Sequence, residues 1–240
     1  MAGDERVTID LGKADFDEIY RGAATIAGEP IRTPPWDIGE PQPELVRLVR
    51  GGELSGRVLD VGCGPGDNAI FLAQQGFSVT AVDASGLAVE AARERAAARG
   101  AEVDFRVADV MALTQRQEFD VVLDSALYHC LPAASRAEYG AALHRVAAEG
   151  ARLHLFTFAD AERETSLVPA AISREELRKN LGRHWRIRGI ELVRFSGAFD
   201  REAALRQFAQ YAPAVDRERL VTDAAGRITF PMWHLRADRA

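Results

Sequence analysis

The chain has 240 residues, of which 47% are hydrophobic and 28% are charged, and this length and composition suit a single α/β domain with a sizeable core. Its formal net charge of −6 provides no basic surface of the kind that neutralises a phosphate backbone, so we expect no nucleic-acid substrate. Its two cysteines are too few for a disulfide framework or a zinc cluster, so we expect no metal partner. No apolar run is long enough to span a membrane, and together these features predict a cytoplasmic protein without a membrane partner.

The first part of the chain differs in composition from the rest. Prolines and glycines crowd into the residues before 44, where they are incompatible with a regular helix or a central strand: Gly28, Pro30, Pro34, Pro35, Gly39, Pro41 and Pro43. We therefore predict that residues 1–43 form an arm and that residues 44–240 form the main domain.

From residue 57 onward, short β-branched runs alternate with alanine-rich stretches of helical spacing. The predicted strands are residues 57–61, 78–82, 103–108, 119–123 and 152–158. The predicted helices between them are residues 67–75, 86–99 and 135–147. This alternation predicts a parallel sheet with helices on both faces, which is a Rossmann-like, doubly wound α/β fold.

The pattern changes after the fifth predicted strand. Ser173 is placed to cap a helix of about two turns, and two extended runs follow at 184–195 and 227–235 without a crossover helix between them. They predict an antiparallel edge hairpin that completes a sheet of about seven strands. Residues 200–220 have helical spacing and predict a lid-like insertion at about 200–222.

A glycine-rich turn joins the first predicted strand to the first helix. Gly62, Gly64 and Gly66 let the backbone approach a ligand at the helix N-terminus. Their spacing is G-x-G-x-G, whereas a dinucleotide site has G-x-G-x-x-G. Asp60 and Asp67 flank the turn, and two carboxylates would repel a pyrophosphate but suit a ligand that carries a cationic amino acid.

Two further aspartates follow the next strands. Asp83 ends the second strand, where a carboxylate accepts hydrogen bonds from ribose hydroxyls, and Asp109 follows the third. Nicotinamide sites also have a ribose-binding acid, so Asp83 alone does not tell the two cofactor classes apart. Only its combination with Asp60 and Asp109 does so. A solvated turn or a helix cap is the alternative role for each aspartate taken alone.

These residues resemble the class I S-adenosylmethionine (SAM)-dependent methyltransferases, over roughly residues 55–158. The first motif of that family reads much like residues 58–66. The resemblance implies that the glycines and neighbouring backbone cradle the methionine portion of SAM. It also implies that Asp60 lies near the SAM amino group, Asp83 and Ala84 near the ribose, and Asp109 and Val110 near the adenine.

The residues after the fourth predicted strand should face the reacting methyl group, because open α/β sheets bind ligands at the carboxyl ends of their strands. They read Asp124-Ser-Ala-Leu-Tyr-His-Cys-Leu-Pro. We expect Asp124 and Ser125 beside the cofactor, with Asp124, Tyr128 and His129 as the catalytic candidates. His129 is either a general base or a positioning group. Tyr128 is a packing or orienting group and not a base, since an unperturbed phenol stays protonated at pH 7.

The arm carries a second resemblance. Thr33-Pro-Pro-Trp-Asp-Ile-Gly-Glu-Pro-Gln-Pro is similar to a segment of the thiopurine and thiol/halide methyltransferases and of bacterial enzymes that methylate heterocycles, phenols or quinols. In that group the arm folds over the cofactor. The resemblance implies that Trp36 covers SAM or the acceptor and that Tyr20 joins it. The alternative is that Trp36 only anchors the arm to the core.

The sequence thus predicts an enzyme that transfers a methyl group from SAM to an O, N or S atom of a small aromatic or heterocyclic molecule and releases S-adenosylhomocysteine. We expect a monomer or a homodimer. Two alternatives remain open at this point, a nicotinamide-dependent oxidoreductase and a SAM-binding module without catalysis.

Overall fold

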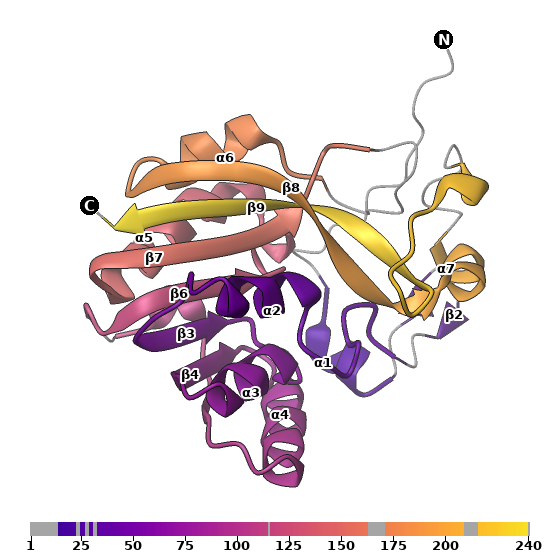
Figure 1. Cartoon of the computed structure of the whole chain (residues 1–240), viewed down its shortest axis with the longest axis horizontal. Helices are drawn as coiled ribbons and strands as arrows, with labels where there is room; N and C mark the ends of the chain where they lie inside the picture. Colours follow the sequence, from indigo (N-terminus) through magenta and orange to yellow (C-terminus); the bar gives the residue numbers. More distant parts are fainter. Residues whose placement is uncertain are drawn as a thin grey trace.

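A seven-stranded sheet organises the molecule (Figure 1). The computed structural model describes residues 14–22, 25–26, 29–30, 33–114, 116–162, 171–208 and 216–239. The sheet has the order β5-β4-β3-β6-β7-β9-β8. Its strands are β3 (Arg57–Val61), β4 (Ser78–Asp83), β5 (Asp104–Val107), β6 (Phe119–Ser125), β7 (Ala147–Phe158), β8 (Trp185–Asp200) and β9 (Arg227–Arg239). A separate antiparallel pair joins β1 (Thr25–Ile26) to β2 (Glu29–Pro30).

The five strands from β3 to β7 are parallel, as the sequence predicts. Four of the five residues of β3 are buried, because helices cover both faces of the sheet. After β5 the chain returns to the other side of β3 and forms β6 there. This reversal opens a crevice beyond the carboxyl ends of β3 and β6, where α/β sheets bind ligands.

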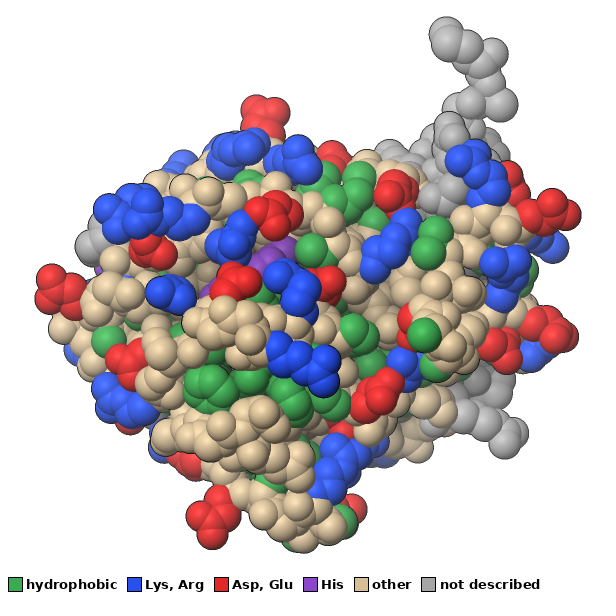
Figure 2. Space-filling model, viewed as in Figure 1, with side chains coloured by type: hydrophobic (Ala, Val, Ile, Leu, Met, Phe, Trp, Pro, Cys, Tyr) green, Lys and Arg blue, Asp and Glu red, His purple; other side chains and the backbone are tan. Residues whose placement is uncertain are grey.

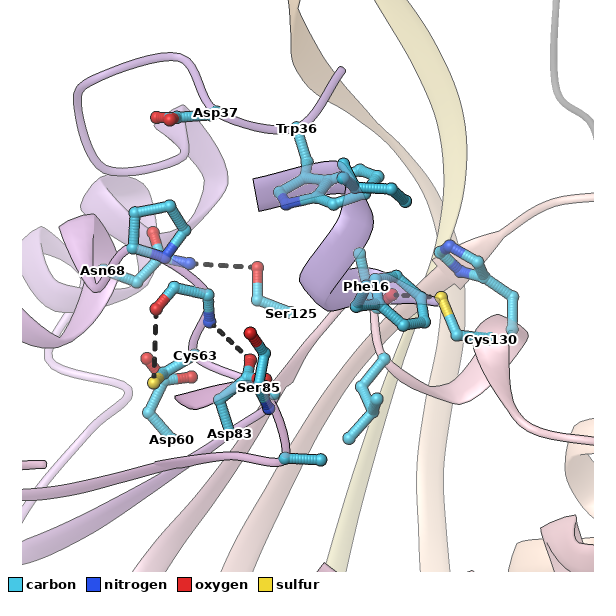
Figure 3. A pocket seen from close by; sticks show the side chains of 18 of the residues that line it. Phe16, Trp36, Asp37, Asp60, Cys63, Asn68, Asp83, Ser85, Ser125 and Cys130 are labelled. Atoms are coloured by element: carbon cyan, nitrogen blue, oxygen red, sulfur yellow. Dashed lines mark hydrogen bonds between the residues drawn. The ribbon is translucent and has the colours of Figure 1, made fainter. Parts of the chain in front are cut away.

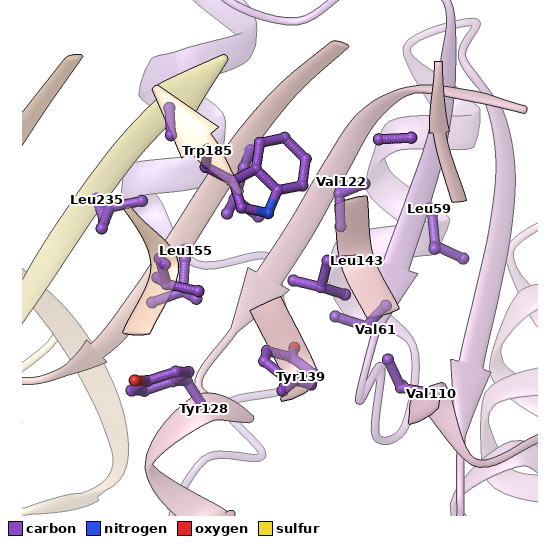
Figure 4. Packing of buried hydrophobic residues seen from close by; sticks show 14 of the residues in the cluster. Leu59, Val61, Val110, Val122, Tyr128, Tyr139, Leu143, Leu155, Trp185 and Leu235 are labelled. Carbon is purple, nitrogen blue, oxygen red and sulfur yellow. The ribbon is translucent and has the colours of Figure 1, made fainter. Parts of the chain in front are cut away.

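Helices cover the sheet on both faces. The α-helices of the described residues are α1 (Phe16–Tyr20), α2 (Pro43–Arg50), α3 (Asp67–Gln74), α4 (Gly86–Ala98), α5 (Arg136–Val146), α6 (Arg174–Leu181) and α7 (Arg201–Phe208), of which α2 to α6 cover the sheet. Buried residues of α5 and α6 pack on one face, in a cluster that includes Leu59, Leu155 and Trp185 (Figure 4). Buried residues of α2, α3 and α4 pack on the other face. The doubly wound fold is therefore confirmed.

The antiparallel edge is also confirmed, but it is longer than predicted. Strand β9 pairs with β7 on one side and with β8 on the other. Both C-terminal strands run past the end of β7 and curve toward α7 (Figure 1). The fifth parallel strand begins at Ala147, where the sequence analysis expected residue 152. Within the predicted insertion, α7 is present, whereas Tyr211 and its neighbours lie outside the described residues.

The sequence analysis predicted neither helix α1, which lies in the arm, nor helix α2, which begins at the last residue of the arm. Helix α2 starts at Pro43, a position that suits proline because the first helical turn needs no N–H donor there. The backbone N–H of Ala198 donates to the carbonyl of Pro35 at 2.8 Å, which ties the arm to β8. The amide of Gln42 donates to the carbonyl of Ser196 and accepts from its N–H, both at 3.0 Å. The arm is thus held against the C-terminal hairpin.

Candidate functional site

A cavity of about 670 Å³ lies at the carboxyl ends of β3, β4 and β6 and is closed from above by the arm. Figure 3 shows its acidic side, with Asp60 and Asp83, opposite its aromatic side, with Phe16 and Trp36. Most of the predicted cofactor residues line it: Tyr20, Trp36, Asp60, Gly62, Gly64, Asp83, Ala84, Asp109, Val110 and Ser125. His129 lines it as well. The topology therefore collects these residues around one space.

The glycines of the turn have different surroundings. Gly64 has a φ of +52°, and a Cβ at this position would meet only the tips of Tyr20 and Trp36 from the arm. Gly66 has a φ of +84°, and a Cβ there would come within 2.9 Å of Ala92 and of the ring of Phe105. Gly64 thus faces the cavity, whereas Gly66 allows α3 to pack closely and does not line the cavity.

Asp60 presents a buried carboxylate to the cavity. It is 1% exposed, and neither of its oxygens has a hydrogen-bond partner. Burial, reinforced by the charges of Asp124 and Asp83, raises the pKa of Asp60 to about 8. An unpaired buried carboxylate is costly, and a cationic ligand would offset that cost. Asp60 therefore fits the ammonium group of a bound amino acid.

Asp83 is held by the glycine turn. One carboxylate oxygen accepts from the N–H of Gly64 at 2.9 Å, and the other accepts from the N–H of Ser85 at 2.9 Å. Burial raises the pKa of Asp83, and these backbone hydrogen bonds oppose the rise. Each oxygen keeps a free lone pair, so the carboxylate is fixed in place and can still accept from a sugar hydroxyl.

Asp109 and Asp67 both have partners in the structure. The carboxylate of Asp109 accepts from the N–H of Met111 at 2.8 Å, so it caps a short turn while it lines the cavity. Asp67 pairs with Arg95 and with Arg99, at 2.6 Å in each case. Asp67 is therefore neutralised by arginines, and only Asp60 supplies an unpaired carboxylate beside the turn, contrary to the expectation that both would favour a cationic ligand.

Two of the catalytic candidates lie outside the cavity. Tyr128 is fully buried and its hydroxyl accepts from the amide of Asn180 at 3.0 Å. Asp124 is also fully buried, and it accepts from the hydroxyl of Tyr139 at 2.6 Å and from the N–H of Leu127 at 2.8 Å. Neither residue lines the cavity. Asp124 stabilises the turn after β6 through the N–H of Leu127, and Tyr128 joins that turn to α6 through Asn180.

His129 does line the cavity, and it is 5% exposed. Its ring stacks on Phe158, with 3.9 Å between centroids and 23° between planes. Burial lowers the pKa of His129 to about 3, with a smaller contribution from the positive charge of Arg136. The imidazole is therefore uncharged at neutral pH.

The wall around His129 is aromatic and apolar. Its other members come from the ends of β7, β8 and β9: Phe158, Phe195, Phe230 and Met232. The sequence analysis missed Phe195, Phe230 and Met232, as well as Gln42 and Asn68 in the cavity wall. Their local sequence pattern could not have identified them, because an inward-facing strand residue has the same pattern whether it lies in the core or in a pocket wall.

The arm closes the cavity through Trp36. The indole N–H donates to the hydroxyl of Tyr20 at 3.1 Å, and the ring of Phe16 lies 5.9 Å from that of Trp36. The next residue, Asp37, forms two hydrogen bonds with Arg95 of α4 at 2.8 and 2.7 Å. The ion pair between the partly buried carboxylate of Asp37 and the guanidinium group of Arg95 thus fixes the aromatic cover to the main domain.

The charged side chains that line the cavity are acidic, and three of them, Asp37, Glu40 and Asp67, pair with arginines outside the lining. Among the described residues that line it, none is a lysine or an arginine. The acidic members of the lining are Asp15, Glu18, Asp37, Glu40, Asp60, Asp67, Asp83 and Asp109. Such a lining disfavours a ligand with an uncompensated negative charge.

Two features of other protein classes are absent from the described part of the chain. No group of three or more histidine, cysteine, aspartate or glutamate residues there is arranged to hold a metal ion. None of the helices in that part is long and apolar enough to cross a membrane.

Comparisons with known proteins agree with this geometry. Residues 58–150 match the family model described as a methyltransferase domain. The chain is 32% identical to the 2-heptyl-1-hydroxyquinolin-4(1H)-one methyltransferase of Mycobacteroides abscessus, over 93% of this chain and 96% of that protein. It is 27% identical over 150 residues to a probable thiol methyltransferase of Arabidopsis thaliana, covering 61% of this chain and 66% of that protein.

Solved structures give the same result. One similar structure concerns the conversion of a disulfide bond into a thioacetal group during echinomycin biosynthesis. The two chains are 32% identical and superpose with a TM-score of 0.74, over 93% of this chain and 91% of that one. A magnesium protoporphyrin IX methyltransferase from Synechocystis PCC 6803, solved with SAM bound, has the same fold, with a TM-score of 0.56 and 23% identity over 82% of this chain and 76% of that one.

Proposed function

The chain belongs to the SAM-dependent methyltransferases, and from that premise we propose that its acceptor is an aromatic or heterocyclic small molecule that carries no charge away from its reacting O, N or S atom. The protein is an enzyme that methylates a small molecule with SAM as its cofactor. Family membership and the G-x-G-x-G spacing both disfavour the nicotinamide-dependent alternative.

The residues present fit SAM. The orphaned carboxylate of Asp60 suits the ammonium group of the methionine portion, and the open approach above Gly64 leaves room for that portion. Asp83 suits the ribose hydroxyls, and Asp109 and Val110 suit the adenine. When bound, SAM supplies a methyl group: the acceptor lone pair forms a bond to the methyl carbon, the bond from that carbon to the cationic sulfur breaks, and its electron pair stays on the sulfur.

One observation supports the acceptor class. The wall beside His129 consists of aromatic and apolar side chains, and the described lining has no cation that would pair with a carboxylate or phosphate on the acceptor. Planar apolar molecules gain most from such a wall. The Mycobacteroides abscessus relative is named for a hydroxyquinolone acceptor, which has this chemistry.

The test is the release of S-adenosylhomocysteine from SAM across a panel of phenols, quinols, thiols and hydroxylated azaheterocycles. Each acceptor is paired with an analogue that carries one additional carboxylate. We expect the neutral member of each pair to react at least about tenfold more efficiently, because burying one unpaired charge costs well over 1.4 kcal/mol. Equal efficiencies within the pairs would contradict the acceptor class. A panel without any turnover would favour the binding-module alternative.

We also propose that residues 1–43 and the insertion at about 200–222 act as lids over this site. Closure would exclude water from the reacting atoms. Part of the insertion lies outside the described residues. Protection of the arm from limited proteolysis by S-adenosylhomocysteine would support the lid role. Unchanged cleavage would contradict it.

We further propose that the enzyme acts as a monomer or a homodimer and without a nucleic-acid partner. The face shown in Figure 2 mixes basic and acidic side chains and has no extended basic field of the kind that a phosphate backbone requires. Light scattering coupled to size-exclusion chromatography, with and without added duplex DNA, tests both statements. A larger assembly, or co-elution with the DNA, would contradict them.

A further inference from the structure

The orientation of His129 follows from the way two strands end. Strand β6 ends at Ser125, which is in register with Phe156 of β7, so Phe158 lies beyond the last residue pair of β6 with β7. The N–H of Phe158 donates to the Nδ1 atom of His129 at 3.3 Å. The hydroxyl of Thr157 lies 3.4 Å from the same nitrogen. His129 thus supplies the acceptor that β6 no longer provides.

This contact determines which nitrogen carries the proton. A backbone N–H can only donate, so Nδ1 must hold a free lone pair, and in a neutral imidazole the proton then lies on Nε2. No hydrogen bond among the described residues uses Nε2, and the ring lines the cavity. Stacking on Phe158 holds the plane of the ring. His129 therefore presents a hydrogen-bond donor, and its only basic lone pair is already engaged.

The neighbouring titratable groups offer no alternative base. Arg136 of α5 is a cation and disfavours a charged ring at His129. Cys130, on the same turn, has its pKa raised to about 12 by burial, and the pKa of Tyr139 is raised well above its ordinary value for the same reason. Asp60 has unpaired oxygens and a pKa of about 8, but it lies on the cofactor side of the cavity, where the ammonium group of SAM would pair with it. Neither Cys130 nor Tyr139 has a pKa suited to accepting a proton near neutral pH.

We propose that His129 is a fixed hydrogen-bond donor and not a general base, and that the enzyme consequently selects acceptors acidic enough to ionise by themselves near neutral pH. Suitable groups are acidic hydroxyls, N-hydroxyls and aromatic thiols, in contrast to simple phenols with a pKa of about 10. The inference rests on the proposed function and deepens it by defining the acceptor group.

The proton balance follows from this assignment. The acceptor releases its proton to water before transfer, and the resulting anion accepts a hydrogen bond from Nε2 of His129. Its lone pair then forms the new bond to the methyl carbon as described above. The negative charge is confined to the reacting atom, where the sulfonium compensates it, so no lysine or arginine is required in the wall.

The first experiment measures kcat/KM against pH for acceptors of similar shape and graded acidity, such as halogenated phenols and thiophenols. We expect the midpoint of the rising limb to move with the pKa of each acceptor. A common midpoint for all acceptors would reveal a titrating group of the enzyme and would overturn the inference. It would leave the proposed function intact, since methylation itself would still be observed.

Two variants separate a donor from a base. His129→Gln keeps an N–H near the position of Nε2 but has no basic nitrogen, whereas His129→Phe keeps the stacking surface and loses both functions. We expect the Gln variant to retain activity within about tenfold of the wild type, with an unchanged pH profile. We expect the Phe variant to lose clearly more. Equal loss in both variants, together with loss of the rising limb, would overturn the inference.

A third readout is independent of turnover and needs only the folded protein. In ¹⁵N-histidine-labelled protein, with His129 assigned by its absence in the Gln variant, we expect a protonated Nε2 and an unprotonated Nδ1 throughout the range of about pH 5 to about pH 8. Titration of the ring within that range, or a proton on Nδ1, would overturn the inference. If no acceptor is methylated, the proposed function fails, and this spectrum alone decides the state of His129.

Discussion

The two sides of the cavity are built in different ways. The cofactor side comes from consecutive strand ends, β3 and β4, with Asp60 and Asp83 placed by backbone geometry. The acceptor side combines the arm, the turn after β6 and the ends of β7, β8 and β9. One side is polar and acidic, and the other is aromatic. In the site proposed above, the residues assigned to SAM recognition are close together in sequence, whereas those assigned to acceptor recognition come from distant segments.

Substitution of Asp83 tests the cofactor side with the largest expected effect. Asp83→Ala removes charge-assisted hydrogen bonds to the ribose, and we expect SAM binding to weaken by about 1.5–3 kcal/mol, or about 10- to 150-fold. Isothermal titration measures this. Asp104→Ala, on exposed β5, is the matched control and should bind SAM normally. Unchanged affinity in the Asp83 variant would show that the nucleoside binds elsewhere.

Asp60→Asn is a second test of the cofactor side. We expect it to weaken SAM binding and to stabilise the ligand-free protein at high pH. Loss of the carboxylate should weaken SAM binding by about tenfold, because an ammonium group loses its counter-charge. The pKa of Asp60 is raised to about 8 from an ordinary 3.8, so its contribution to the stability of the ligand-free fold is complete below about pH 4 and is lost as the pH rises through 8.

We therefore expect Asp60→Asn to be more stable than the wild type at about pH 9, with a smaller difference at about pH 4. Urea unfolding of the ligand-free proteins at both values measures this. A variant that is less stable at the higher pH would indicate that Asp60 has a partner in the folded protein.

Substitution of Phe230 tests the acceptor side. The ring of Phe230 packs edge-on against that of Phe158, with 5.7 Å between their centroids. Phe230→Leu removes this aromatic contact and keeps an apolar side chain in its place. We expect KM for the acceptor to rise about threefold to tenfold and the affinity for SAM to stay unchanged, because the contact is worth about 0.5–1.5 kcal/mol. A comparable loss of SAM affinity would show that the two sides do not act independently.

The smallest effect is expected where the two sides meet. Arg95→Met removes the pairing of α4 with Asp37 and so loosens the arm that carries Trp36, and it also removes one of the two arginine partners of Asp67. Because Arg95 is 30% exposed, we expect SAM affinity and acceptor KM both to weaken by only about twofold to fivefold. Arg50→Met, on the exposed side of α2, is the control. An effect on only one ligand would assign the arm to that side alone.

The sequence by itself determined the parallel sheet, its antiparallel edge and the polar side of the cavity. Strand and helix periodicity is local, and Gly64, Asp60 and Asp83 belong to strand ends whose place in a doubly wound sheet is fixed by topology. These predictions needed no knowledge of distant contacts. The family to which the chain belongs followed from the same residues.

Only the tertiary structure decided the rest. In the folded protein, Asp124 and Tyr128 of the turn after β6 form hydrogen bonds away from the cavity, and Asp67 pairs with arginines. The tertiary structure also brought Phe195 and Phe230 to the cavity and joined the N–H of Phe158 to His129. A side chain's protonation, partners and exposure depend on groups that are far away in the chain and near in space, and no local pattern records which groups those are.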